Sequence, residues 1–213
     1  MTKIIKASRG KGRTYHHGDL RVALVAAARS ILEKEGLNAM SLRGAARSSG
    51  VSQAAPYHHF ADKDALLDAV AAQGFAELDS AMRARMAKAP DAMEKLVASG
   101  VAYVLFAVKN PALFRVMFGA TMQDATAHVE RLEAGGRAYG TLQEAVAGAL
   151  VDCKPENLPV TFLSTWSLVH GLAMLLTEGG LDPAQYGAQN AEELAERMIG
   201  STCGRDRIML SAS

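Results

Sequence analysis

The chain has 213 residues, of which 49% are hydrophobic and 21% charged, a composition that fits one or two globular domains and excludes a disordered or collagen-like chain. The net charge is only +1, but residues 1–64 carry 11 basic and 5 acidic side chains, against 12 and 17 in the remainder. This asymmetry indicates that the first third faces a polyanion, although a chance fluctuation of surface charge gives the same pattern.

The first fifteen residues contain basic side chains, no acidic one and no apolar period. We expect residues 1–15 to form a flexible basic arm that, with His16 and His17, reaches DNA phosphates or the minor groove. A disordered extension with only nonspecific attraction for DNA is the alternative. Because no apolar segment typical of a secretory signal opens the chain, the expected location is the cytoplasm.

Four short helices are expected in about residues 16–70, which form the first predicted domain. The first covers about residues 19–35, where apolar side chains recur every three or four positions until Gly36 ends the pattern. Ser41 is a favourable N-cap for the second helix. Gly50 can adopt the positive φ with which the chain turns after that helix.

The third and fourth helices are expected directly after this turn. Ser52 is the expected cap of the third helix, on which Tyr57 and Phe60 share a face. Pro56 falls early in this helix, where it removes one hydrogen bond at a tolerable cost. Asp62 is the expected cap of the fourth helix. A capped helix, a glycine turn and a second capped helix are the pattern of a helix-turn-helix, whose second helix enters the major groove of DNA.

The second predicted domain, residues 71–200, is also expected to be helical, because no apolar run alternates in the manner of a strand. Breaks are expected at Pro90, residues 109–111, Gly135-Gly136, residues 155–159 and Gly179-Gly180. Residues 158–176 carry no charge and are long enough for a membrane span, but their polar residues favour a central helix buried on all sides and no membrane. Residues 201–213 are expected to form a loose tail.

The segment around the turn resembles a known family. The residues that carry the resemblance are Val51-Ser52, Tyr57-His58-His59-Phe60, Lys63 and Leu66-Leu67. They are similar to the signature of the TetR family of bacterial transcriptional regulators. The resemblance covers about residues 19–70. It implies an all-α fold of about nine helices, with an N-terminal three-helix helix-turn-helix DNA-binding domain and a C-terminal helical domain that binds a small ligand and dimerises.

Two positions depart from the pattern of this family. Gly44 stands where many members have an acidic residue, so the second helix lacks a capping box and is expected to be less stable by up to about 1 kcal/mol. Pro56 stands where an aliphatic residue is common, but it resembles one branch of the family that carries Ala-Ala-Pro-Tyr. We therefore expect Pro56 to change the pose of the recognition helix without abolishing it.

Base recognition is assigned to the start of the third helix. Gln53 can bond an adenine edge with its amide, while Ala54 and Ala55 can contact a thymine methyl. Ser52 suits a helix cap and a phosphate donor equally well.

Contacts to the DNA backbone are assigned to four further residues. The resemblance implies this role for Tyr57, His58 and Lys63, of which Lys63 lies near the start of the fourth helix. Arg43 on the second helix is a further candidate, with a merely solvated side chain as the alternative. His58 and His59 do not predict a metal site, because neighbours on a helix diverge by about 100° and no third ligand follows at a useful spacing.

A candidate ligand pocket is assigned to the second domain. Phe162, Trp166 and His170 share one helical stripe, which resembles the Trp-x-x-x-His-Gly pattern of a recurrent C-terminal domain type in this family. Further apolar candidates flank the break at residues 109–111, namely Phe106, Phe114, Met117 and Phe118. An ordinary hydrophobic core is the alternative for both groups. A cavity lined by them suits a hydrophobic or aromatic small molecule.

These patterns predict a sequence-specific transcriptional repressor that a small effector releases from a palindromic DNA operator. Residues 158–177 and about 184–199 are candidates for a two-fold four-helix interface, because a palindrome requires a symmetric homodimer. The alternatives are a ligand-dependent activator and a nonspecific basic DNA-binding protein. No motif of a hydrolase, nucleotide-binding or dinucleotide-binding enzyme is present, so neither catalysis nor a cofactor is expected.

Overall fold

The computed structural model describes residues 17–119, 129–150 and 154–202, and these residues form eight α-helices and no strand. The α-helices are α1 (His17–Glu35), α2 (Leu42–Ser48), α3 (Lys63–Met86), α4 (Ala92–Lys109), α5 (Pro111–Phe118), α6 (Val129–Ala149), α7 (Leu158–Thr177) and α8 (Ala191–Thr202). Four short 3-10 helices join them, η1 (Leu37–Ala39), η2 (Ala55–His58), η5 (Pro155–Asn157) and η6 (Pro183–Tyr186). The predicted all-α fold is confirmed. The expected arm and most of the expected tail lie outside the described residues, while Ser201 and Thr202 belong to α8.

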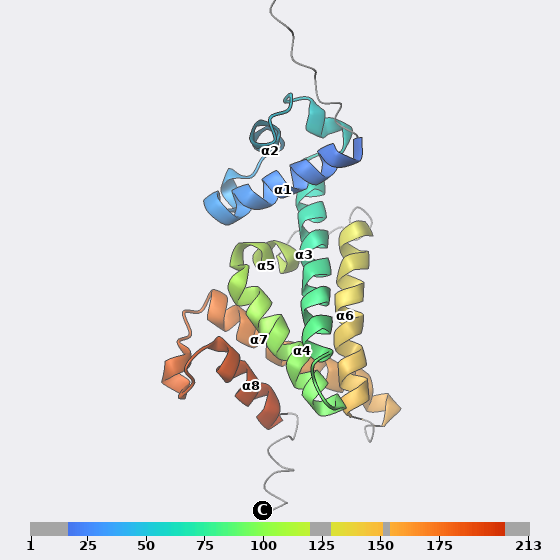
Figure 1. The fold of residues 1–213 in the computed structure, drawn as a ribbon, viewed down its shortest axis with the longest axis vertical. Helices are drawn as coiled ribbons and strands as arrows, with labels where there is room; N and C mark the ends of the chain where they lie inside the picture. The colour runs from blue at the N-terminus through green and yellow to red at the C-terminus, as the bar shows by residue number, and fades with distance from the viewer. Residues whose placement is uncertain (1–16, 120–128, 151–153, 203–213) are drawn as a thin grey trace, which may run out of the picture.

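The helices form a small unit at one end of the molecule and a larger bundle below it (Figure 1). The small unit consists of α1, α2 and the start of α3. Helix α3 continues into the bundle, where it lies alongside α6 and packs against α4. Because α3 runs without a break through residue 70, the two predicted domains share this helix.

Helix α4 is the centre of the bundle, since α3, α5, α6, α7 and α8 all pack against it. Its apolar residues Val101 and Val104 are completely buried. Gly100 faces both α7 and α8, and a Cβ atom there would lie 2.7 Å from Ile199 Cδ1 and 3.1 Å from Val169 Cγ1. The absence of a side chain at Gly100 therefore allows the three helices to meet.

The break predicted at Gly135-Gly136 is wrong, because both glycines lie inside α6. A glycine within a helix costs about 1 kcal/mol relative to alanine. Helix α6 buries Ala138, Leu142 and Val146 in the core, and this packing outweighs the intrinsic cost of its glycines.

The prediction that residues 158–176 are buried on all sides is also wrong. Helix α7 buries the face that includes Phe162 and Val169, but Val160, Leu163 and Leu175 are between 50% and 67% exposed. Within the described residues this is the helix that is long and apolar enough to cross a membrane by length and composition. These three side chains give α7 an apolar outer face that the described elements leave exposed.

Candidate nucleic-acid interface and ligand cavity

The turn after α2 is held by hydrogen bonds at both ends of the helix. Ser41 caps the start of α2, where its Oγ accepts from the backbone N–H of Gly44 at 3.0 Å. At the other end, Gly50 has a φ of 69° and the N–H of Val51 donates to the carbonyl of Ala46 at 3.1 Å. This arrangement is a Schellman motif, in which a positive φ closes the helix. The predicted cap and turn are confirmed.

The segment after the turn differs from the predicted third α-helix. Residues 55–58 form the 3-10 helix η2, and the N–H of Ala55 donates to the carbonyl of Ser52 at 3.0 Å. In an α-helix capped by Ser52, that carbonyl would accept from residue 56. Because Pro56 has no N–H, the tighter i to i+3 pattern replaces the α-helical one.

The two aromatic residues that were predicted to share a face are separated, because η2 ends at His58 and Phe60 lies beyond it. Phe60 is only 3% exposed, whereas Tyr57 is 53% exposed. The guanidinium of Arg21 on α1 lies over the Phe60 ring, 5.4 Å from its centroid, and Arg21 also pairs with Glu130 at the start of α6. Phe60 is therefore anchored in the core and Tyr57 faces solvent.

The candidate DNA-binding residues lie on α2, in and just before η2, and at the start of α3, in the small unit at the end of the molecule away from α8 (Figure 1). The exposed ones are Arg43, Ser52, Gln53, Ala54, Tyr57 and His58. Ala55 and Lys63 are half-buried. Lys63 Nζ donates to the carbonyl of Leu37 at 3.1 Å, which leaves two of its three donors for a phosphate.

An aromatic cluster lies inside the bundle. Tyr103 Oη of α4 and His170 Nδ1 of α7 are 2.8 Å apart, and the rings of Phe114 and Phe118 lie 5.5 and 4.8 Å from the His170 ring. Burial raises the pKa of Tyr103, against an opposing hydrogen bond from Trp166, and burial lowers the pKa of His170. Both directions favour the neutral side chains, so a phenol that donates to an unprotonated Nδ1 fits this site.

A small apolar cavity of about 50 Å³ adjoins this cluster. Its lining residues come from α3 to α7 and are Phe75, Leu78, Tyr103, Phe118, Gly135, Ala138, Tyr139, Leu142 and Trp166. Two of the predicted pocket residues, Phe118 and Trp166, line it. The predicted residues Phe114, Met117 and Phe162 are almost completely buried core residues.

Sequence reasoning missed Tyr103 and Tyr139 at this cavity. Tyr103 stands in an otherwise apolar run of α4. A buried phenol needs a hydrogen-bond partner, and this requirement is the signal that could have identified Tyr103. No comparable signal marks Tyr139, whose ring packs against Phe162 with centroids 4.3 Å apart.

The sequence did not predict a second hollow that the structure contains. It is an open groove of about 810 Å³ bordered by residues of α1, α3, α4 and α8. Ala98 and Leu105 provide apolar surface, and Phe106, a predicted pocket residue, lies here rather than at the small cavity. The groove reaches Arg29 on α1, so it extends from the bundle to the small unit.

A helix capped by Ser41, a Schellman turn and an exposed segment that begins at Gln53 define a helix-turn-helix DNA-binding protein with a helical second domain. Comparison with known families agrees. Residues 24–70 match the model of the bacterial regulatory proteins of the tetR family, and residues 96–202 match that of the tetracyclin repressor-like C-terminal domain. The chain belongs to the TetR family of bacterial transcriptional regulators.

Solved structures of similar fold cover nearly the whole chain. A protein of unknown function from Rhodococcus sp. RHA1 is 34% identical, with a TM-score of 0.76 over 92% of this chain and 98% of that one. The TetR family transcriptional regulator PfmR from Thermus thermophilus is 18% identical, with a TM-score of 0.60 over 83% and 91%. The fatty acid degradation regulator FadR from Bacillus halodurans is 16% identical, with a TM-score of 0.63 over 92% and 97%. No curated protein matches the chain.

Proposed function

We propose that this DNA-binding transcriptional regulator is a repressor that binds a palindromic operator as a homodimer and leaves it when a small hydrophobic effector binds. The observation that carries the proposal is that α3 both follows the DNA-reading segment and lines the apolar cavity, through Phe75 and Leu78. A ligand that displaces α3 therefore acts on the segment that meets DNA. Release requires that the effector binds the DNA-free arrangement more tightly than the DNA-bound one.

The reading segment supplies the contacts that a specific regulator needs. The Gln53 amide and the methyl groups of Ala54 and Ala55 are of the types that read base edges in the major groove. The other candidates carry donors for phosphates, and they are Arg43, Ser52, Tyr57, His58 and Lys63. Gln53 and Ala54 are exposed ahead of η2, so their side chains are accessible to a base.

The effector proposed for the cavity is an apolar or aromatic small molecule with one polar group. The lining is almost entirely apolar, and the lining residues that carry a polar group are Tyr103, Tyr139 and Trp166. Pockets for drug-sized ligands measure about 300 to 1,000 Å³. A cavity of about 50 Å³ must therefore widen to admit such a molecule, and this widening is the displacement that couples binding to release.

Family members act on DNA as dimers, and we assign the two-fold interface to α7 and α8. The outer face of α7 exposes Val160, Leu163 and Leu175 in one stripe. Helix α8 packs beside α7. Two copies of this pair form a four-helix contact that buries the stripe and holds two reading segments at operator spacing. A bacterial regulator that binds chromosomal DNA acts in the cytoplasm, so we assign the protein to the cytoplasm.

Selection of bound duplexes from a random pool by the full-length protein at moderate salt tests the specific function. A palindromic consensus is expected, and a specific site is typically bound about 10³ to 10⁷ times more tightly than other DNA. A pool without enrichment contradicts the proposal and supports nonspecific basic binding, which depends steeply on salt but not on sequence.

A reporter that carries the selected site in its promoter separates a repressor from an activator. Expression that rises when the regulator is removed supports repression. Expression that falls on removal assigns the protein as an activator and contradicts the proposed sign of regulation.

A further inference from the structure

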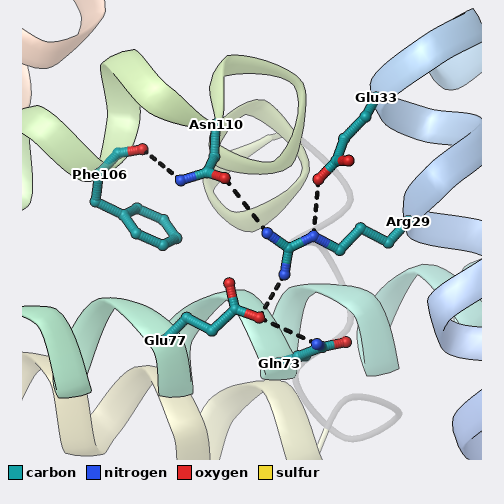
Figure 2. A network of polar contacts seen from close by, with 6 residues as sticks. All are labelled: Arg29, Glu33, Gln73, Glu77, Phe106 and Asn110. Carbon is teal, nitrogen blue, oxygen red and sulfur yellow. Dashed lines mark hydrogen bonds and ion pairs between the residues drawn. The ribbon is translucent and has the colours of Figure 1, made fainter.

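One arginine joins the small DNA-binding unit to the bundle. Arg29 of α1 donates from Nε to Glu33 at 2.8 Å, pairs through Nη1 with Glu77 of α3, and donates from Nη2 to Asn110 Oδ1 at 3.3 Å (Figure 2). Its side chain is only 19% exposed. Glu33 lies on the same helix as Arg29, so the contacts to Glu77 and Asn110 are the ones that cross between elements.

Asn110 lies at the bend between α4 and α5, which we call the elbow. It lies between α4 and α5, which are bent by 109° to one another, and Pro111 follows it as the first residue of α5. Its side-chain Nδ2 donates to the carbonyl of Phe106 at 2.9 Å, while its Oδ1 accepts from Arg29 (Figure 2). Both ends of the amide are therefore held, and a change in the bend between α4 and α5 moves Oδ1 relative to Arg29.

Helix α5 forms part of the wall of the small cavity. Phe118 lines the cavity, and the ring of Phe114 packs edge-on against Tyr103 at 5.7 Å. With eight residues, α5 is the shortest of the helices that line the cavity. Because the cavity must widen to admit a ligand, displacement of this short helix about its elbow offers a direct way to make room.

Helix α1 contacts elements on both sides of the DNA-reading segment. Helix α2 packs against α1, and Ser49 Oγ donates to the carbonyl of Ala23 at 3.3 Å. Phe60, two residues after η2, lies under Arg21 of α1. A shift of α1 therefore shifts the turn and the residues that follow it.

The contact between Arg29 and Asn110 can break without leaving a charge unpaired. Arg29 keeps Glu33 and Glu77 when it loses the neutral amide, and the hydrogen bond to Glu77 is the main reason for its raised pKa. Breaking a buried pair is costly chiefly when a charge remains uncompensated. This contact is therefore suited to two arrangements of similar energy, which a switch requires.

We propose that Arg29 and Asn110 are positioning residues, through which the angle of α5 at the cavity sets the position of α1 and of the DNA-reading segment. The proposal rests on the proposed function and specifies how its ligand site is regulated. Neither residue need touch DNA or effector.

Hydrogen exchange of the full-length protein without DNA or ligand provides the first test. Asn110→Ala is expected to speed exchange in α1 and α2 by about fivefold or more, since amide protection reports local stability. Asn110→Asp, which keeps an acceptor for Arg29 but loses the donor to Phe106, is expected to restore slow exchange. Glu33→Ala is the matched control, because it removes an Arg29 contact that stays within α1, and it is expected to exchange like the wild type. If the Ala and Asp variants are equally fast, Asn110 acts only as a helix cap and the proposal fails.

Affinity for the duplex selected by the wild-type protein provides the second test. Arg29→Ala and Asn110→Ala are each expected to change the dissociation constant by about fivefold or more, within the range of known allosteric couplings. The dissociation constant of the double variant is expected to change no more than that of either single variant. If the two fold-changes multiply instead, the residues act independently and the proposal is overturned. If the wild type selects no duplex, the proposed function fails. The hydrogen-exchange measurement still tests the role of Arg29 and Asn110, because it requires no DNA.

Discussion

Tyr103 of α4 and His170 of α7 share a hydrogen bond of 2.8 Å inside a cluster of aromatic rings. The bond joins the central helix of the bundle to the helix whose outer face is proposed to dimerise. Burial raises the pKa of Tyr103 and lowers that of His170, so it favours the neutral form of both side chains at neutral pH. Stability should therefore depend on pH through this pair.

Acid should weaken the fold through His170. Its ordinary pKa is 6.5 and its pKa in the folded protein is lower, so below about pH 6.5 the unfolded chain binds a proton that the folded chain does not. The free energy of unfolding should fall as the pH drops from 6.5 toward the lowered pKa, and this contribution should level off below it. Urea unfolding between pH 5 and 8 measures the slope. His170→Gln should show a smaller slope, and an unchanged slope would show that His170 does not contribute.

The close approach of α4, α7 and α8 should depend on Gly100. Gly100→Ala places a Cβ atom against Ile199 and Val169 and should lower the free energy of unfolding by about 1 to 3 kcal/mol, since overpacking outweighs the gain in helix propensity. Gly136→Ala on α6, where no neighbour lies within 4 Å, should instead stabilise by up to about 1 kcal/mol. Chemical unfolding of both variants makes the comparison. Equal effects would mean that the packing around Gly100 relaxes freely.

Dimerisation should depend on the outer face of α7. Leu163→Arg places a charge in the proposed interface and should convert the dimer to a monomer, as measured by sedimentation. Leu132→Arg on α6 is the matched control, because Leu132 is similarly exposed and lies outside α7 and α8. A Leu163 variant that remains dimeric would place the interface elsewhere.

Base preference should depend on Gln53. Gln53→Ala should relax specificity at one base pair in each half-site by about 1 to 3 kcal/mol, because its amide is the group assigned to a base edge. Repeating the duplex selection with this variant measures the change. An identical consensus would remove Gln53 from the base-reading residues.

Backbone contact should depend on Lys63. Lys63→Ala should weaken binding to all sequences alike and lower the slope of log affinity against log salt by about 0.9 for each lost contact. Lys95→Ala, an exposed lysine on α4 in the bundle, should leave the slope unchanged. If Lys63→Ala keeps the wild-type slope, the bond to the Leu37 carbonyl is the whole role of Lys63.

Local sequence determined the helix caps, the turn and the family signature. Ser41, Gly50 and Asp62 act through hydrogen bonds to residues within a few positions of themselves, so their roles follow from residue type and spacing. The first helix was predicted within two residues of α1 for the same reason. The effect of Pro56 is local too, but the prediction that an α-helix tolerates Pro56 is wrong. Because Pro56 lacks an N–H, the segment forms a 3-10 helix instead.

Tertiary structure decided which faces are covered and which distant side chains meet. Both faces of α7 carry apolar side chains, and packing against α4, α6 and α8 decides which face is buried. Gly135 and Gly136 remain helical because α6 is held by the core rather than by its own propensity. Arg29 and Asn110 are 81 positions apart in the chain, and no periodic pattern relates them. Such contacts depend on where whole helices pack, because the side chains that meet are chosen by helix angles and volumes that no short stretch of sequence contains.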